Sequence, residues 1–244
     1  YGIDIYDKVM LIPLLDKLSQ IKNLEWIRLH YLYPENVNDE LLDYIAKNPK
    51  ICKYVGIPLQ HIDENILISM NRRVFEEQSR ELIFKLKTKY PQIAIRSTFI
   101  VGYPGEKKKQ FNKLVEFIKE AKLNNVGFFP YYREEKTKAY FLKKQNSNYT
   151  KLMRLRKIQK IQTEVANELN KNRIGETVRV LIDRFDETTG YYVCHDEFNS
   201  FSVDFEILLD GNSNVELGKF YNINIVDYNN GYLIGEIQWI HQIN

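Results

Sequence analysis

The chain has 244 residues, of which 44% are hydrophobic and 27% are charged. This balance allows a sizeable apolar core and is typical of a folded protein. Every apolar run falls far short of the roughly 18–20 residues that cross a bilayer, so a membrane-spanning protein is not expected.

The two cysteines, Cys52 and Cys194, lie far apart in the sequence. They exclude a disulfide framework and fit a reducing compartment, where buried thiols are the simplest expectation. The chain opens at Tyr1 with neither a methionine nor a basic leader, so we expect no secretory signal and a cytoplasmic location. For the same reason we do not expect Tyr1 to be a native start.

The net charge of +3 conceals a division along the chain. Residues 1–170 contain 30 Lys and Arg against 20 Asp and Glu, a net charge of +10. Residues 171–244 contain 5 against 12, a net charge of −7. Asymmetry of this size predicts two domains that meet different partners.

Helical and strand-like patterns alternate through the first two thirds of the chain. In order they predict a helix over 11–21, a strand over 24–31, a helix over 38–46 capped by Asn38, a strand over 53–57, helices over 63–70 and 75–88, a strand over 93–101, a helix over 106–123 and a strand over 125–129. The strand centres lie about 30 residues apart, which is typical of repeated βα units around a parallel sheet. Residues 1–148 therefore read as part of a TIM-type (βα) barrel in an α/β fold.

A long basic helix is predicted over 149–171, within a connecting segment 149–174. After Gly175 the pattern changes to five short β-runs, at residues 176–183, 190–195, 201–208, 219–228 and 232–240. Gly190, Asp210–Gly211 and Asn229–Gly231 supply turns between them. The sequence therefore predicts a small antiparallel β-barrel over residues 175–244.

Three of the predicted parallel strands end in clusters of polar and special residues, at 58–61, 102–106 and 130–134. Side chains at the carboxyl ends of such strands commonly build an active site. Gly102 and Gly105 would let backbone approach a ligand, and Glu106 is expected in the first turn of the following helix. A tight turn with nothing bound explains these five residues at least as well, and neither a dinucleotide fingerprint nor a phosphate loop is present.

Several polar residues on these strands could contact a ligand. Gln60 could hydrogen-bond one, whereas His61 is more simply a loop histidine that caps backbone groups. His30 and Arg96 lie on other strands, and a charged Arg96 inside the apolar run IAIRSTFIV needs a partner. An anionic ligand or an internal ion pair would serve equally.

Two basic runs are also candidates for anion binding. Asn71–Arg73 has the composition of a phosphate clamp, and Lys107–Lys109 is a run of three lysines. A solvated surface would also explain both, and for the lysines it is the expectation. Nothing in the sequence supplies a nucleophile elbow, a zinc-protease helix or a metal set of nearby Cys and His.

Taken together, the segments resemble the radical SAM methylthiotransferase family, in its ribosomal-protein branch. The matching strings are WIRLHYLYPENVNDELLDYIAKNPKICKYVGIPLQHIDENILISMNRR, RSTFIVGYPGE and FFPYYREEKT, followed by a β-rich tail that is similar to a TRAM domain. The PLQH and MNRR strings favour the ribosomal-protein branch over the tRNA-modifying relatives. Their order and spacing, rather than any one string, carry the resemblance.

The resemblance implies a six-stranded partial TIM barrel that binds a 4Fe–4S cluster and S-adenosylmethionine. The cluster would cleave the cofactor to a 5′-deoxyadenosyl radical, and a methylthio group would be installed on the β-carbon of an aspartate in a small-subunit ribosomal protein. By position, the strand end at 99–106, which includes Gly102, would pack near the adenine. The cofactor or substrate cavity would be lined by His30, Gln60, Arg96 and Phe129.

Departures from the family qualify this expectation. The CxxxCxxC motif that holds the cluster is absent, and two distant cysteines cannot replace it. The motif and the first barrel strands would precede Tyr1, so this chain alone is expected to bind no iron and to be inactive. The family usually has serine at Tyr132 and glycine at Lys136, so the cavity mouth is expected to differ.

The acidic tail bears on the partner. An RNA-binding TRAM domain should be basic, so a tail with a charge of −7 is expected to bind no RNA directly and suits a basic ribosomal protein. A solvated acidic surface without a partner is the alternative. Two other readings of the whole chain are a non-catalytic remnant that only docks on a ribosomal protein, and a tRNA methylthiotransferase, which PLQH and the acidic tail disfavour. The protein is expected to be a monomer.

Overall fold

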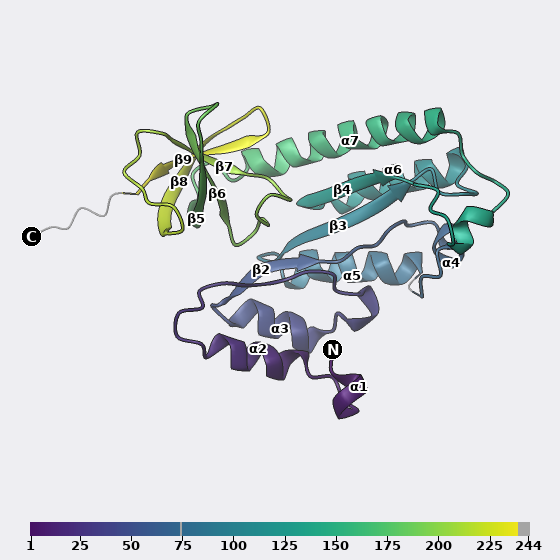
Figure 1. The fold of residues 1–244 in the computed structure, drawn as a ribbon, viewed down its shortest axis with the longest axis horizontal. Coiled ribbons are helices and arrows are strands. Elements are labelled where there is room, and N and C mark those ends of the chain that lie inside the picture. The colour runs from purple at the N-terminus through teal and green to yellow at the C-terminus, as the bar shows by residue number, and fades with distance from the viewer. Residues whose placement is uncertain (74, 239–244) are drawn as a thin grey trace, which may run out of the picture.

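The computed structural model describes residues 1–73 and 75–238. Figure 1 shows two parts, a layered α/β part and a small β-barrel, joined by one long helix. The α/β part contains a four-stranded, all-parallel sheet in the order β1-β2-β3-β4, formed by Ile27–Leu29, Ile51–Gly56, Ala94–Val101 and Asn125–Pro130. Among the described residues the sheet does not close, as expected for a partial barrel.

Helices alternate with these strands and cover one face of the sheet. In chain order they are α1 (Ile3–Tyr6), α2 (Leu11–Ser19), the 3-10 turn η1 (Pro34–Asn36), α3 (Asp39–Lys47), α4 (Glu64–Ser69), α5 (Glu76–Lys89), α6 (Lys108–Ala121), the 3-10 turn η2 (Lys138–Phe141) and α7 (Asn148–Lys171). Leu42, Leu86 and Leu114 from three of these helices are buried with Phe99 of β3 in one apolar core. Burial of such side chains stabilises the layer by about 1.5–3 kcal/mol each.

Local sequence signals account for several element ends. The Asn38 side chain accepts a hydrogen bond from the Leu41 amide at 2.9 Å, so its predicted N-cap is confirmed. Asp63 caps α4 in the same way, through the Ile66 amide. The predicted strand over 24–31 is too long, because only Ile27–Leu29 pairs with β2.

Glu106 was wrongly expected in the first turn of α6. The helix begins at Lys108, with Lys107 as its N-cap, and Glu106 lies before it in the turn after β3. Its side chain is buried, so its function is to accept hydrogen bonds within that turn rather than to complement the helix dipole.

The β-barrel is closed in the order β5-β6-β7-β9-β8, formed by Thr177–Asp186, Tyr191–Asp196, Ile207–Asp210, Tyr232–Ile237 and Phe220–Asn229. Four of its pairings are antiparallel, but β7 pairs with β9 in parallel, so the prediction of a purely antiparallel barrel is wrong in this pairing. The strand predicted over 201–208 instead occupies Ile207–Asp210. The predicted end of the last run, Trp239–Ile240, lies outside the described residues.

Turn chemistry agrees with the hairpins of the barrel. Asn230 and Gly231 join β8 to β9 with φ of 48° and 89°, the left-handed pair that tight hairpins require. The barrel has its own apolar core, in which Ile182, Ile207, Ile223 and Leu233 are fully buried.

Candidate functional site at the inner face of the sheet

The sheet face opposite the helices, here called the inner face, carries the predicted site residues. Along β3, Ile95, Phe99 and Val101 point into the helix-covered core, so Arg96 and Thr98 point the other way. Gly127 of β4 faces them, since a methyl group built on it would lie 3.5 Å from Arg96 Nη2 and 3.8 Å from Thr98 Oγ1.

The barrel covers the amino-terminal part of this inner face. The connection between β6 and β7 contributes residues 196–204, which we call the clasp. Each of the four strands donates hydrogen bonds to the clasp from one side chain. Arg28 donates to the Asp196 and Glu197 carbonyls at 3.0 and 2.7 Å, and Asn125 donates to the Phe198 carbonyl at 3.0 Å. Tyr54 and Arg96 donate to the Asp204 carboxylate at 2.9 and 2.8 Å. The clasp therefore fixes the two parts of the chain against each other.

An internal ion pair satisfies Arg96. Its Nη1 donates to Asp204 Oδ1, and the two side chains are only 16% and 3% exposed. Asp204 also accepts from the Tyr54 hydroxyl and from the Ser200 amide at 2.8 Å. Of the two partners left open by the sequence, an anionic ligand and an internal carboxylate, the structure supplies the second, and it comes from the barrel.

His30 follows β1 and lies near this pair. Its Nε2 lies 3.4 Å from the Ser200 hydroxyl, and its ring packs 5.5 Å from that of Tyr54. Desolvation, reinforced by the positive charges of Arg28 and Arg96, lowers the pKa of His30 below 6.5. His30 is therefore a neutral imidazole at neutral pH, able to accept or donate a hydrogen bond.

Two cavities meet at Arg96. One, of about 300 Å³, is lined by residues that include His30, Tyr31, Arg96, Thr98 and Ser200. The other, of about 660 Å³, is lined by Arg96 and Phe129 on the sheet, by Gln162 on α7 and by Tyr228 on the barrel. The structure thus brings His30, Arg96 and Phe129 to the same face, around one guanidinium.

Gln60 and Gly102 lie away from these cavities, at the carboxyl edge of the sheet. Gln60 forms an isolated parallel bridge with Phe99, through its amide to the Thr98 carbonyl and its carbonyl to the Ile100 amide. Its φ of 67° and the φ of 57° at Tyr31 are left-handed values that are uncommon for residues other than glycine. Strained backbone of this kind gathers at ligand sites, although the strain alone assigns no ligand.

Gly102 is required by packing as well as by conformation. Its φ is 75°, and a methyl group there would lie 2.5 Å from Lys151 Cγ of α7. Lys151 is buried beside it, and its pKa is lowered by desolvation and by the charge of Arg133. The close approach of this glycine is therefore made to a helix of the same chain.

Sequence reasoning missed the central part played by Glu106. Its carboxylate accepts from the Gly102 amide at 2.9 Å and from Arg154 of α7 at 2.7 Å. Nε2 of the buried His61 lies 3.5 Å away and has no closer partner among the described residues, while His61 Nδ1 accepts the Asp63 amide at 2.9 Å. His61 therefore caps a backbone amide of its loop, as expected. The role of Glu106 could have been suspected from the sequence, because GYPGE places an acidic residue in a turn directly after a buried strand.

The cysteines do not form a metal site. Cys52 and Cys194 are both fully buried, one under the clasp and one in the barrel core. Desolvation raises the pKa of Cys52 to about 11, which leaves it a neutral thiol. Across residues 1–73 and 75–238, no three His, Cys, Asp or Glu side chains are grouped to hold a metal ion.

Comparison with known proteins agrees with the fold. Residues 4–118 match the Radical SAM superfamily and residues 174–237 match the TRAM domain. The chain is 39% identical over 97% of its length to "Ribosomal protein uS12 methylthiotransferase RimO" of Flavobacterium johnsoniae, and 40% identical over 97% to the protein of the same name from Caldanaerobacter subterraneus. Over nearly its whole length the chain is similar to these methylthiotransferases, and it matches the Radical SAM superfamily and the TRAM domain in that order. It spans about half the length of these curated relatives, 54% and 53% respectively.

A solved structure supports the fold alone. Coproporphyrinogen III oxidase (HemN) from Escherichia coli, a radical SAM enzyme, aligns with a TM-score of 0.52 over 63% of this chain and 37% of its own, at 14% identity. The predicted partial radical SAM barrel followed by a TRAM-like barrel is therefore confirmed. Within the described residues, no helix is both long and apolar enough to cross a membrane.

The cofactors of this family can be tested against the residues present. A 4Fe–4S cluster does not fit, because its iron needs several thiolates and this sequence has two buried, distant cysteines. S-adenosylmethionine fits the inner face better. Nη2 of Arg96 points toward Gly127 rather than Asp204, and a neutral imidazole and an aromatic ring flank it.

Proposed function

We propose that this chain forms the cofactor and substrate wall of an enzyme that methylthiolates the β-carbon of an aspartate in ribosomal protein uS12. The observation that carries the proposal is the identity of 37–40% over 97% of the chain to relatives that bear this name. The chain's own geometry adds a polar, partly enclosed face at the place where parallel-sheet enzymes bind their ligands.

In this proposal the inner face holds S-adenosylmethionine. Arg96 would pair with the carboxylate of the cofactor, His30 would accept a hydrogen bond from its ammonium group, and Phe129 would pack against its apolar part. Gln60 and Gly102 would bound the adenine end at the carboxyl edge of the sheet. When bound, the cofactor would supply the radical precursor and the methyl group, and the cluster that activates it would be held by cysteines outside this chain.

The barrel is proposed to meet the substrate protein. Its net charge of −7 over residues 171–244 complements a basic ribosomal protein and steers association more than it adds affinity. Modification of a ribosomal protein would place the reaction in the cytoplasm.

A chimera tests this function. The matching 237 residues of the Flavobacterium johnsoniae relative would be replaced by this chain, and the product reconstituted with iron and sulfide without oxygen. With S-adenosylmethionine and uS12, mass spectrometry should show one added methylthio group on an aspartate, and the Arg96→Ala chimera should lose cofactor affinity and turnover.

Two results would contradict the proposal. One is a chimera that holds its cluster and cleaves S-adenosylmethionine but leaves uS12 unmodified. The other concerns the cluster: this chain purified alone should bind no iron, and stoichiometric iron–sulfur absorption would refute that part.

A further inference from the structure

Positive charge is concentrated at the carboxyl end of the parallel sheet. Residues 133–160, from the end of β4 through the first half of α7, contain ten Lys and Arg and two Glu, a net charge of +8. Most of these side chains are exposed, including Arg133, Lys136, Lys138, Lys143 and Lys144. More than a quarter of the chain's basic residues therefore lie on a small part of its surface.

Two other basic segments join this one in space. Leu142 and Met70 both pack against the buried cluster of Ile66, Tyr103 and Tyr131, which brings the segment after α4, with Arg72 and Arg73, close to residues 133–144. The Gly105 amide donates to the Lys144 carbonyl at 2.8 Å, which brings residues 107–109 alongside. We call the surface formed by residues 72–73, 107–109 and 133–157 the basic rim.

The basic rim is not neutralised within the described chain. Apart from the partly buried Arg154, none of its basic side chains lies within 4.0 Å of a carboxylate of residues 1–73 or 75–238, although exposed lysines elsewhere do. Lys85 and Lys89 pair with Asp39, and Lys122 pairs with Glu168. Unpaired charge of one sign attracts a polyanion over about a Debye length.

Exposed aromatic rings lie among these charges. Tyr132, Phe141 and Tyr149 are 78%, 73% and 73% exposed, which is unusual for large apolar side chains. Rings interleaved with basic groups are what proteins present to unpaired nucleic-acid bases, because every base can stack while its phosphate is neutralised. An acidic peptide would account for the charges but not for the rings.

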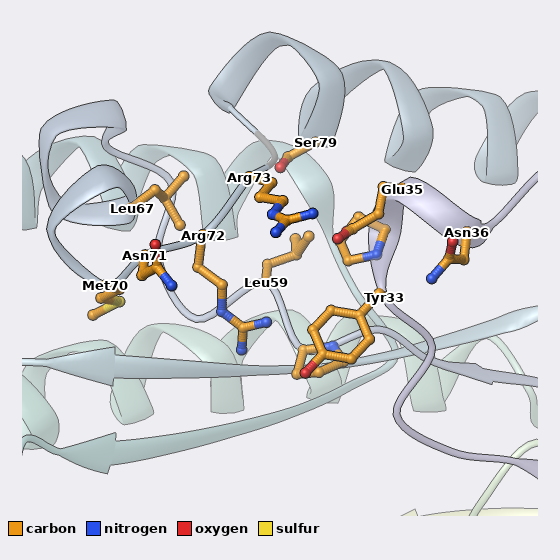
Figure 2. Close-up of a pocket in the computed structure, with 12 residues that line it drawn as sticks. Tyr33, Glu35, Asn36, Leu59, Leu67, Met70, Asn71, Arg72, Arg73 and Ser79 are labelled. Carbon is orange, nitrogen blue, oxygen red and sulfur yellow. The ribbon is translucent and has the colours of Figure 1, made fainter. Parts of the chain in front are cut away.

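A pocket on the rim shows the same combination. Figure 2 shows Arg72 reaching toward Tyr33, and Arg73 pointing toward Glu35, in a cavity of about 500 Å³ that Asn71 also lines. The Arg72 guanidinium lies 5.5 Å from the Tyr33 ring centre, and neither arginine has a carboxylate within 4.0 Å among the described residues. Two guanidiniums and a half-exposed ring suit one nucleotide, with its phosphate on the arginines.

Backbone strain also marks the rim. Lys136 adopts φ of 68° and Asn71 adopts φ of 58°, both in the left-handed region. A lysine there costs about 1 kcal/mol relative to glycine, so folding alone does not favour it. Its presence is consistent with a charge used for binding.

We infer that the basic rim binds single-stranded RNA. The barrel lies at the other end of the molecule, as Figure 1 shows, and residues 175–244 carry 3 Lys and Arg against 12 Asp and Glu, a net charge of −9. RNA would therefore be oriented toward the carboxyl edge of the sheet. This binding goes beyond the proposed methylthiotransferase function and needs neither cofactor nor protein substrate, so either can fail without the other.

The test measures binding of a fluorescent, single-stranded 15-nucleotide RNA to the full chain by polarisation, over a series of salt concentrations. A quadruple variant replaces Lys136, Lys138, Lys143 and Lys144 by Gln. Its matched control replaces four exposed lysines on α1–α3 and their connections, Lys8, Lys17, Lys22 and Lys47, with the same reduction of charge.

For the unaltered chain, the logarithm of the RNA association constant should fall linearly with the logarithm of the salt concentration. In the rim variant this slope should become less steep by up to roughly 3, at about 0.7 for each phosphate that the lysines no longer neutralise. The control should change the slope by much less. Tyr132→Ala and Tyr149→Ala should each weaken binding by about five- to hundredfold where the ring stacks on a base. Circular dichroism confirms that each variant is folded.

Three outcomes would overturn the inference. These are no measurable RNA binding by the unaltered chain, equal weakening in the rim and control variants, and polyglutamate of equal charge competing as well as RNA does. Equal affinity for an RNA duplex would show that the aromatic rings do not stack on unpaired bases, and would contradict the inference that the rim prefers single-stranded RNA.

Discussion

Loss of the Asp204 carboxylate should separate the two parts of the chain. In Asp204→Ala the Arg96 guanidinium, the Tyr54 hydroxyl and the Ser200 amide would each be without this acceptor. The Arg96–Asp204 ion pair is largely buried, with the Asp204 side chain only 3% exposed. Breaking a buried ion pair costs about 3–5 kcal/mol because the remaining charge is uncompensated. Since Arg96 keeps some contact with solvent, we expect the low end, about 3 kcal/mol.

The assay is urea unfolding followed by two probes. Far-UV circular dichroism reports the whole chain, and tryptophan fluorescence reports the interface. Trp26 packs 4.8 Å from Phe220 of the barrel, and a Trp239→Phe background makes it the sole tryptophan. The midpoint of the fluorescence transition should fall more than that of the dichroism transition, because the clasp opens before either core unfolds.

Two controls make this result specific. Glu206→Gln removes a more exposed pair with Arg184 and should cost less than about 1 kcal/mol. Replacing both partners, with Arg96→Met and Asp204→Leu together, should restore much of the stability, since an apolar pair of similar size can substitute for a buried ion pair. A cost below about 1 kcal/mol for Asp204→Ala would refute the reasoning.

Three other measurements follow from the structure. The Cys52 pKa of about 11 leaves about 0.1% thiolate at pH 8, so Ellman's reagent should react with it only after urea unfolding, and reaction in the native chain would contradict its burial. The pKa of His30 is lower in the folded chain than in the unfolded chain, so the unfolded chain takes up the proton first as pH falls, and the free energy of unfolding decreases below about pH 6.5. NMR titration of the His30 ring should show the lowered pKa, and Arg96→Gln should raise that pKa because it removes a positive charge. Glu106→Ala should lower the free energy of unfolding by about 3–5 kcal/mol in chemical denaturation, because Arg154 would remain partly buried without its carboxylate, and the isosteric Glu106→Gln should cost less.

Local patterns predicted the elements better than they predicted what those elements contact. The apolar run at 93–101 and the capping residue Asn38 act within a few residues, and both are found as predicted. The strand over 24–31 was overestimated because an apolar alternating pattern continues past the point where the parallel partner ends. The parallel pairing of β7 with β9 depends on barrel closure, which no short window contains.

The site shows the same limit. The composition around Arg96 established that it needs an anionic partner, but Asp204 lies 108 residues away on a different part of the fold. Glu106 was assigned to a helix by its acidic character, whereas its true contacts are with Gly102 and Arg154. Charge and burial rules state what a residue requires, and only the tertiary structure states which neighbour supplies it.

The distribution of charge gives these separate features a common explanation. An acidic barrel is held to the amino end of the sheet, where Arg28 donates to backbone carbonyls of the clasp and Arg96 pairs with the Asp204 carboxylate. The carboxyl edge is the basic end of the chain. Between the two ends lies the inner face with its two cavities. A ribosomal protein with its RNA presents both signs of charge. In the proposed enzyme, each sign would meet its complement on opposite sides of the cavities, which would bring the protein chain rather than the RNA to the cofactor.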